Sequence, residues 1–276
     1  MKDSKKVLSV QDISCHGQCS NTVILPLLSA AGLETVILPT ALLSTHTGGF
    51  SGFTFLDMTE EMERILAHYE QINLKFDILQ TGYFGSPAQI ATVRRMAFPL
   101  LKEGALRIVD PVLGDNGHLY SIYTDEFVTA MRELCADADI ITPNITEACL
   151  LTGTPYCADA DADFCFALAE KLKALGPRTV LVTGVKFGDG RSGVVGEENG
   201  ERFTASSPYV ARNFHGTGDV FAGALVGRLA RGESAASAAA FAANFVYGCI
   251  TDTLPVIDTH WYGLRFEGRL GEIAEK

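Results

Sequence analysis

The chain has 276 residues, of which 47% are hydrophobic and 20% charged, as is typical of a folded globular protein. A chain of this length buries a substantial core as one α/β unit, so we expect residues 1–276 to form a single domain. The 22 basic and 33 acidic side chains leave a net charge of −11, which argues against a nucleic-acid-binding surface. No apolar stretch approaches the roughly 20 residues that cross a bilayer, so we expect no membrane partner.

The seven cysteines are odd in number and widely scattered, which favours a reducing compartment over a disulfide framework. The N-terminus is not followed by an apolar core of the length that a signal peptide needs. We therefore expect a cytoplasmic protein.

Short apolar runs alternate with longer helical patterns along the first two thirds of the chain. The apolar runs predict strands at Val7–Gln11, Thr35–Pro39, Phe76–Gln80, Arg107–Asp110, Ile140–Thr142 and Thr179–Thr183. The longer patterns predict helices at Asn21–Ala31, Thr59–Tyr69, Pro87–Lys102, Asp125–Leu134 and Asp161–Leu175. Apolar strands separated by helices indicate an α/β fold with a mostly parallel sheet covered on both faces.

Polar or glycine-rich residues follow each predicted strand. They are Gln11-Asp12, Thr40 to Thr47, Thr81-Gly82-Tyr83, Asp110-Pro111, Pro143-Asn144 and Gly184. In parallel sheets, ligands bind beyond the carboxyl ends of the strands. Six such strand ends therefore predict one cleft along a single edge of the sheet.

Two segments interrupt the alternation of strands and helices. The glycine-rich run Thr45–Phe55 is unsuited to a helix and predicts a small flap of strands near residues 41–57. The run Ser192–Ser206 alternates around Asn199-Gly200, which predicts a β-hairpin with those two residues in its turn.

The strongest motif is Gly216-Thr217-Gly218-Asp219, which precedes the apolar helical run Val220–Leu229. The glycines leave backbone N–H groups free to face an anion, and the following helix adds its positive end. An Asp at a helix start is most often only an N-cap. Here the carboxylate stands beside a phosphate-sized set of N–H groups, which favours phosphoryl transfer with Asp219 as the base.

Two further strand ends carry hard oxygen ligands. Asp110 opens the run Asp110–Asp115, and Asn144 and Glu147 lie in the run Thr142–Glu147. Mg²⁺ takes few protein oxygens together with waters and substrate phosphates, which fits these residues. Turn chemistry for Asp110 and helix capping for Asn144 explain them equally well.

With these motifs, the chain resembles the ribokinase-like superfamily, specifically the vitamin B6 (pyridoxal/pyridoxamine) kinases, nearly from end to end. The pieces that carry the resemblance are Val7–Gln11, Gly17–Asn21, Ser44–Thr47, Thr81–Tyr83, Asp110–Asp115, Thr142–Glu147 and Gly216–Asp219. The resemblance implies a three-layer αβα sandwich and ATP-dependent phosphorylation of the 5′-hydroxymethyl group of a B6 vitamer. It also implies a homodimer, Mg²⁺, and a monovalent cation such as K⁺ near the nucleotide.

The resemblance assigns roles to individual residues. Asp219 is the general base, and Gly216, Thr217 and Gly218 form the anion hole for the transferred phosphoryl group. Asp110 and Glu147 are the carboxylates of the metal site, which acts partly through water. The nucleotide and its ion are expected to contact Asp110, Asn144, Glu147, Thr183, Gly216 and Gly218.

The resemblance also places His46, Thr47 and Tyr83 in the pyridine pocket and makes Gly114–Tyr123 a lid that excludes water. The residues themselves leave the role of His46 undecided, since a lone His in a loop more often forms its hydrogen bonds with local backbone.

Asp12 departs from the family pattern, because the better-known pyridoxal kinases have Ser at this position. A carboxylate can pair with a protonated ring nitrogen or with the amine of pyridoxamine. We therefore expect Asp12 to shift preference toward pyridoxamine or charged ring forms. Capping of the next turn is the alternative.

Two other functions stay open at this stage. A hydroxymethylpyrimidine kinase of thiamine synthesis has the same fold and a similar hydroxymethyl substrate, although Ser44–Thr47 and Gly82-Tyr83 favour a B6 vitamer. A non-catalytic pyridoxal phosphate binder is less consistent with an intact Asp219, since a binder needs no base.

Overall fold

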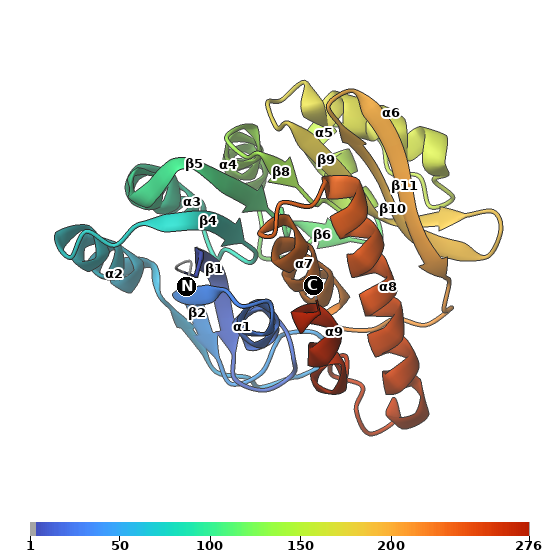
Figure 1. The fold of residues 1–276 in the computed structure, drawn as a ribbon, viewed down its shortest axis with the longest axis horizontal. Helices are drawn as coiled ribbons and strands as arrows, with labels where there is room; N and C mark the ends of the chain where they lie inside the picture. The colour runs from blue at the N-terminus through green and yellow to red at the C-terminus, as the bar shows by residue number, and fades with distance from the viewer. Residues whose placement is uncertain (1–3, 276) are drawn as a thin grey trace.

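The computed structural model describes residues 4–275. Among these residues, nine strands form one sheet in the order β11-β10-β9-β8-β5-β4-β1-β2-β3 (Figure 1). The strands from β9 to β2 run parallel, while β10, β11 and β3 pair antiparallel at the two edges. The strand bounds are β1 (Lys6–Ser14), β2 (Glu34–Leu43), β3 (Phe55–Asp57), β4 (Phe76–Thr81), β5 (Leu101–Val109), β8 (Ile140–Ile141), β9 (Thr179–Phe187), β10 (Arg191–Glu198) and β11 (Glu201–Pro208).

The helices form two layers on opposite faces of this sheet (Figure 1). One layer contains α2 (Thr59–Gln71), α3 (Pro87–Thr92), α4 (Asp125–Ala136), α5 (Ile145–Thr152) and α6 (Ala162–Lys173). The other contains α1 (Asn21–Ala30), α7 (Thr217–Leu229), α8 (Ala235–Thr253) and α9 (Leu270–Ala274). This arrangement confirms the expected αβα sandwich.

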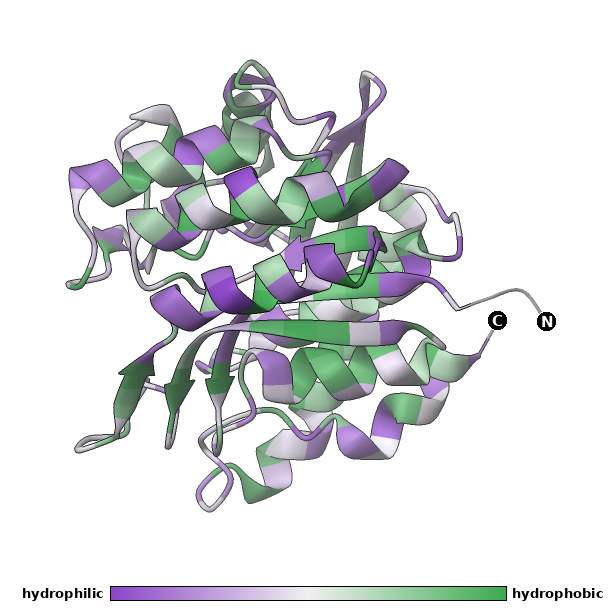
Figure 2. Ribbon diagram, turned by 90° about the vertical axis from the view of Figure 1, so that its left-hand side faces the viewer, coloured by the Kyte–Doolittle hydropathy of each residue, from purple (hydrophilic) through white to green (hydrophobic). Residues whose placement is uncertain are grey.

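Each central strand sends alternate side chains into two hydrophobic cores. In β1, Leu8 packs into the core beneath α2–α6, whereas Val7 packs into the core beneath α1, α7 and α8. In β9, Val180 packs into the first of these cores and Leu181 into the second. Figure 2 shows hydrophobic colour along the strands and mixed colour on the helices. The sheet is therefore buried on both faces, as its apolar strands predict.

The predicted helix Pro87–Lys102 is helical as far as Leu100 and wrong only at its end. Helix α3 is α-helical to Thr92, and the chain continues through a π-helical turn and a 3₁₀ turn before β5 begins at Leu101. Pro99 has no N–H with which to continue the helix. Strand β5 is therefore six residues longer at its start than the predicted strand from Arg107. Helix α5, which follows Asn144, was not among the predicted helices.

The two irregular segments are arranged as follows. The β10–β11 hairpin is confirmed, with Asn199 and Gly200 at positive φ angles of 53° and 87° in its turn. The flap has less strand than predicted, because only Phe55–Asp57 pairs with the end of β2 and residues 44–54 form an irregular loop. No helix among residues 4–275 is long and apolar enough to cross a membrane.

Candidate active site

Backbone hydrogen bonds hold the predicted strand-end residues together at the carboxyl edge of the sheet. The N–H of Asp110 donates to the carbonyl oxygen of Thr81 at 3.2 Å, and the N–H of Thr183 donates to that of Pro143 at 2.8 Å. Asn144 and Thr183 also form an isolated β-bridge beyond the ends of β8 and β9. The chain ends of neighbouring strands therefore lie side by side, as parallel pairing requires.

Asp219 lies inside the first turn of α7 and is not its N-cap. Gly216 is the N-cap, with φ 76°, so Asp219 is the third residue of the helix. Burial raises the pKa of the Asp219 carboxyl to about 7, the nearby Asp12 adds to this, and the backbone N–H of Ser20 opposes it. Asp219 is therefore not present as an N-cap. A buried carboxyl whose pKa is raised toward neutrality is typical of a functional site.

The two glycines of the motif differ in how closely they are surrounded. A Cβ atom at Gly216 would lie 2.4 Å from the carbonyl oxygen of Gln18, so only glycine fits there. A Cβ at Gly218 would lie 3.9 Å from Oδ2 of Asp110, which places Asp110 opposite the first turn of α7. The first N–H groups of a helix have no acceptor within the helix, so this turn is suited to hold an anion.

Four carboxyl groups line this edge of the sheet and interact in sequence: Asp12, Asp219, Asp110 and Glu147. Burial, with help from Asp219, raises the pKa of Asp110 to about 8. Burial and then Asp110 raise the pKa of Glu147. Such a row of desolvated carboxyls is best stabilised by a cation.

Asp110 and Glu147 differ in their freedom to bind that cation. Among residues 4–275, no hydrogen-bond donor contacts the Asp110 carboxylate, and only burial and Asp219 act on its pKa, so it is free to coordinate a metal. Glu147 accepts the N–H of Leu113 at 3.1 Å and that of Asn144 at 2.8 Å. Because Asn144 in turn caps α5 at the Glu147 N–H, both residues form a capping box.

The donor set therefore fits Mg²⁺ only in part. Among the described residues, no three His, Cys, Asp or Glu side chains converge tightly enough to hold a metal ion by themselves. Asp110 is suited to bind the ion directly, whereas Glu147 and Asn144 are suited to bind water molecules that the ion carries. Mg²⁺ commonly keeps several waters and substrate phosphates, so this set is adequate for an ion that arrives with a nucleotide.

The segment predicted as a lid contains a small hairpin of β6 (Gly114–Asp115) and β7 (His118–Leu119). The N–H of Gly117 donates to the Thr146 hydroxyl at 2.9 Å, and the Asn144 side chain donates to the Gly114 carbonyl oxygen at 2.9 Å. The hairpin is thus attached to the start of α5, beside the carboxyl row.

His46 is satisfied by backbone on both ring nitrogens. Nε2 lies 2.8 Å from the carbonyl oxygen of Tyr262 and donates to it, and Nδ1 accepts the N–H of Gly48 at 3.0 Å. Burial lowers the pKa of His46, so the ring is neutral. Both nitrogens are occupied, and only the ring carbons remain for a substrate. Thr47, the next residue, is exposed on the flap.

Tyr83 and Asp12 are neighbours in the buried part of the site. Burial and then Asp12 raise the pKa of the Tyr83 phenol to about 12, so it stays a neutral donor. Asp12 is 5% exposed, and its carboxyl accepts a hydrogen bond from the Ser14 hydroxyl at 2.7 Å. Burial raises the pKa of Asp12, which a positively charged partner would reverse.

Sequence reasoning missed three contributors to the site. Ser14 and Ser20 both approach Asp12, and Tyr262 from the C-terminal part of the chain fixes His46. Ser14 carried a usable signal, since it follows Asp12 by two residues on the same strand, and Ser20 lies within the matched piece Gly17–Asn21, to which no role was assigned.

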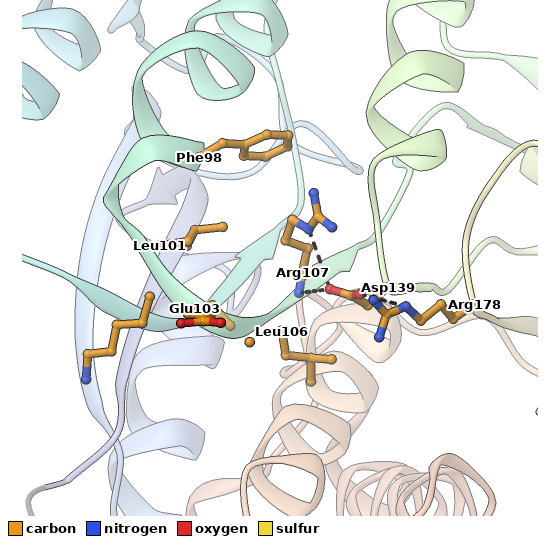
Figure 3. A pocket seen from close by; sticks show the side chains of 10 residues that line it. Phe98, Leu101, Glu103, Leu106, Arg107, Asp139 and Arg178 are labelled. Carbon is orange, nitrogen blue, oxygen red and sulfur yellow. Dashed lines mark hydrogen bonds and ion pairs between the residues drawn. The ribbon is translucent and has the colours of Figure 1, made fainter.

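A cavity of about 380 Å³ lies away from these residues, beside the amino-terminal half of β5 (Figure 3). Phe98, Arg107 and Arg178 line it, and both guanidinium groups lie 3.5 Å from the Asp139 carboxylate. None of the candidate residues borders it. The pairing with Asp139 joins β5, β8 and β9, which is a structural role.

Comparison with known proteins places this geometry in a family. The family model described as phosphomethylpyrimidine kinase matches residues 26–262. The chain belongs to this family. It is also 33% identical over 245 residues to a pyridoxine/pyridoxal/pyridoxamine kinase of Bordetella avium, covering 83% of this chain and 78% of that protein. The chain is therefore a kinase that phosphorylates an alcohol group.

Solved structures agree along nearly the whole chain. A Bacteroides thetaiotaomicron protein, provisionally named a phosphomethylpyrimidine kinase and crystallised with pyridoxal, matches with a TM-score of 0.93 at 36% identity, covering 99% of this chain and 96% of that one. Pyridoxal kinase of Lactobacillus plantarum matches with a TM-score of 0.90 at 32% identity, covering 98% of this chain and 96% of that one. Pyridoxal kinase of Leishmania donovani with ADP and pyridoxamine matches at 0.86 and 26%, again covering 98% and 96%. The resemblance to B6 kinases is confirmed.

Proposed function

We propose that this kinase transfers the γ-phosphoryl group of ATP to the 5′-hydroxymethyl group of a B6 vitamer. The pyridoxal held by the Bacteroides protein and the ADP and pyridoxamine held by the Leishmania kinase support this choice of substrates. The observation that carries the proposal lies in this chain: a buried carboxyl with a pKa of about 7, set beside the glycine turn that begins α7.

Asp219 takes the proton of the hydroxymethyl group as that oxygen attacks the γ-phosphorus and the bond to ADP breaks. A base is most effective when its pKa is close to the working pH, which the buried Asp219 satisfies. The N–H groups of Gly216, Thr217 and Gly218 face the charge that develops on the transferred phosphoryl oxygens.

Mg²⁺, when bound, neutralises charge on the nucleotide phosphates. Asp110 would contact the ion directly, and Glu147 and Asn144 would hold its waters. Thr183, which forms a bridge to Asn144, is placed to contact the phosphates from β9. A monovalent cation such as K⁺ near the nucleotide rests on the family resemblance.

The vitamer ring lies beside Tyr83 and Asp12, with His46 and Thr47 of the flap over it. Tyr83 offers an aromatic face and a neutral hydroxyl, and His46 offers its ring carbons. Apolar surface with few directed polar groups is the usual character of a small-molecule site. The hairpin at Gly114–Leu119 excludes water that would otherwise accept the phosphoryl group.

Asp12 is expected to favour the positively charged vitamer. Replacing Asp12 with Ser should lower kcat/KM for pyridoxamine by roughly 10-fold or more, the value of one charge-assisted hydrogen bond, and lower it less for pyridoxal. Asp12→Asn, which keeps the shape and removes the charge, is the matched control and should show the same selectivity. Equal losses on both vitamers, measured under the same conditions, would exclude a role in selection.

Activity is expected to rise with pH through about 7. Only the deprotonated Asp219 accepts a proton, and burial has raised its pKa from an ordinary 3.8 to about 7. The kcat/KM for pyridoxal should therefore fall about tenfold per pH unit below that value. The measurement is a pH–rate profile between pH 5 and 9. In Asp219→Asn the residual activity should lose this slope, and an unchanged slope would assign it to another group.

The runner-up substrate is hydroxymethylpyrimidine, a pyrimidine related to the phosphomethylpyrimidine for which the matched family is named. A side-by-side assay of ADP formation with pyridoxal, pyridoxamine, pyridoxine and hydroxymethylpyrimidine separates the two. Turnover of a vitamer supports the proposal, and turnover of hydroxymethylpyrimidine alone replaces it. A non-catalytic pyridoxal phosphate binder has no support from a family of kinases.

A homodimer in the cytoplasm completes the proposal. The exposed Leu42, Phe55 and Leu56 on the β2–β3 edge form an apolar surface that a second copy would cover. Sedimentation velocity tests this, since a chain of 29.6 kDa that sediments as a monomer at micromolar concentration contradicts it. All seven cysteines are free, as suits a reducing compartment.

A further inference from the structure

Ser20 has a backbone conformation that only glycine adopts readily. Its φ of 57° and ψ of −132° lie outside the regions that side chains with a Cβ normally occupy. Gln18, two residues earlier, also has a positive φ, of 49°. Non-glycine residues persist in such conformations when the surrounding structure requires it, and they concentrate at functional sites.

The usual reason for a serine at this place does not apply. Ser20 is the N-cap of α1, where a serine side chain typically accepts an N–H of the first helical turn. The Ser20 side chain makes no such bond, and its carbonyl oxygen accepts the N–H groups of Val23 and Ile24 instead. Ser20 is only 8% exposed. Its buried hydroxyl is therefore directed to something other than the helix.

Ser20 lies beside Asp12. It forms an isolated antiparallel β-bridge with Ile13, the residue after Asp12, and the side chain of the next residue, Asn21, donates to the Asp12 carbonyl oxygen at 3.1 Å. From this position its hydroxyl lowers the pKa of the Asp12 carboxyl, and its backbone N–H lowers that of Asp219. Ser14 donates to Asp12 Oδ2 at 2.7 Å, and the Ser20 hydroxyl is a second polar group near the same carboxyl. The same loop contacts the anion hole through Gln18, whose carbonyl oxygen occupies the space beside Gly216.

We infer that Ser20 is a positioning residue, whose hydroxyl orients Asp12 toward the substrate ring while its N–H orients Asp219 toward the reacting hydroxymethyl group. The inference rests on the role proposed for Asp219. Glycine would adopt the same backbone angles without strain and would keep the N–H, but it would lack the hydroxyl. The strained serine therefore adds to what glycine would give only a hydroxyl, which acts on Asp12, and its fixed backbone holds the N–H that acts on Asp219.

Two substitutions separate the hydroxyl from the backbone. Ser20→Ala keeps a Cβ and the strain but removes the hydroxyl, and it should raise KM for pyridoxamine roughly 5–10-fold with a smaller change in kcat. Ser20→Gly also releases the strain, so it should raise Tm by roughly 2–5 °C while lowering kcat about tenfold as the N–H facing Asp219 becomes mobile. If Ser20 had only a structural role, Ser20→Gly would not raise Tm and lower kcat at the same time.

Asn73 supplies the matched control, because it also has a positive φ, of 52°, in an exposed loop between α2 and β4. Asn73→Gly should change Tm without changing kcat or KM. Wild-type kinetics in both Ser20 variants would overturn the inference, as would a fall in Tm in Ser20→Gly. If the wild-type enzyme turns over no vitamer, the proposed function fails separately. Calorimetric titration of pyridoxamine then decides the role of Ser20, since Ser20→Ala must still weaken binding.

Discussion

Replacing Asp219 with Ala should lower kcat for pyridoxal by roughly 10²–10⁴-fold, the usual contribution of a general base. The same substitution should not destabilise the protein. The carboxyl is desolvated and repelled by Asp12 and Asp110, and burial has raised its pKa to about 7. Removing it relieves that repulsion, so Tm should stay equal or rise, as is common at strained catalytic positions. The measurements are ADP release at pH 8 and thermal unfolding.

Asp219→Asn sharpens this experiment, because the amide keeps the shape and can still accept the N–H of Ser20 while it has no basicity. Asp159→Ala, on an exposed loop before α6, is the matched control for loss of a carboxylate and should leave kcat unchanged. If either Asp219 variant retained activity within about threefold of wild type, Asp219 would not be the base. Loss of activity together with a lower Tm in both variants would instead assign Asp219 a structural role.

Much of the fold was predictable because buried strands carry a strong pattern. The runs at Val7 and Thr179 are apolar on both faces, and such runs between helices specify a parallel sheet without any knowledge of the loops. The error at Lys102 has a local cause. The segment from Pro87 keeps a helical composition, but Pro99 ends the helical turns and the chain enters β5 six residues before Arg107.

The gathering of Asp110, Asn144 and Thr183 was predictable for a similar reason, since parallel strands deliver their carboxyl ends to one edge. The contacts that each side chain makes could not be predicted in this way. Asn144 and Glu147 satisfy each other as a capping box, and His46 uses both nitrogens on backbone. These outcomes depend on where loops distant in sequence come to lie.

The conformation of Ser20 is the clearest example of what the sequence pattern cannot convey. Serine before a helix predicts a cap, yet the side chain turns away from α1 toward Asp12. That choice depends on the bend at Gly17, on the packing of Gln18 against Gly216, and on the burial of Asp12. None of these follows from periodicity or composition.

Gly216→Ala should lower kcat/KM by at least about 10²-fold, the effect of displacing an oxyanion-type donor. It should also cost roughly 1–3 kcal/mol of stability. The added methyl group would meet the Gln18 carbonyl oxygen at 2.4 Å, at a position where φ is 76°. The obstacle is backbone, so no rotation of a side chain relieves it. The loop from Gln18 to Ser20 or the first turn of α7 must move, and either shift misplaces the N–H groups that receive the phosphoryl charge.

Substitutions at two other glycines distinguish the effect of backbone strain from the effect on catalysis. Gly232, just beyond the C-terminus of α7, has φ 89° with open space around it, so Gly232→Ala should lower stability by about 1 kcal/mol and leave kcat/KM unchanged. Gly218 would place a methyl group 3.9 Å from Asp110, an ordinary contact, so Gly218→Ala should lower activity with little loss of stability. If Gly216→Ala behaved like Gly232→Ala, the turn would be structural and the phosphoryl group would have to be held elsewhere. If it lost activity beyond its loss of stability, as Gly218→Ala should, the start of α7 is the anion hole.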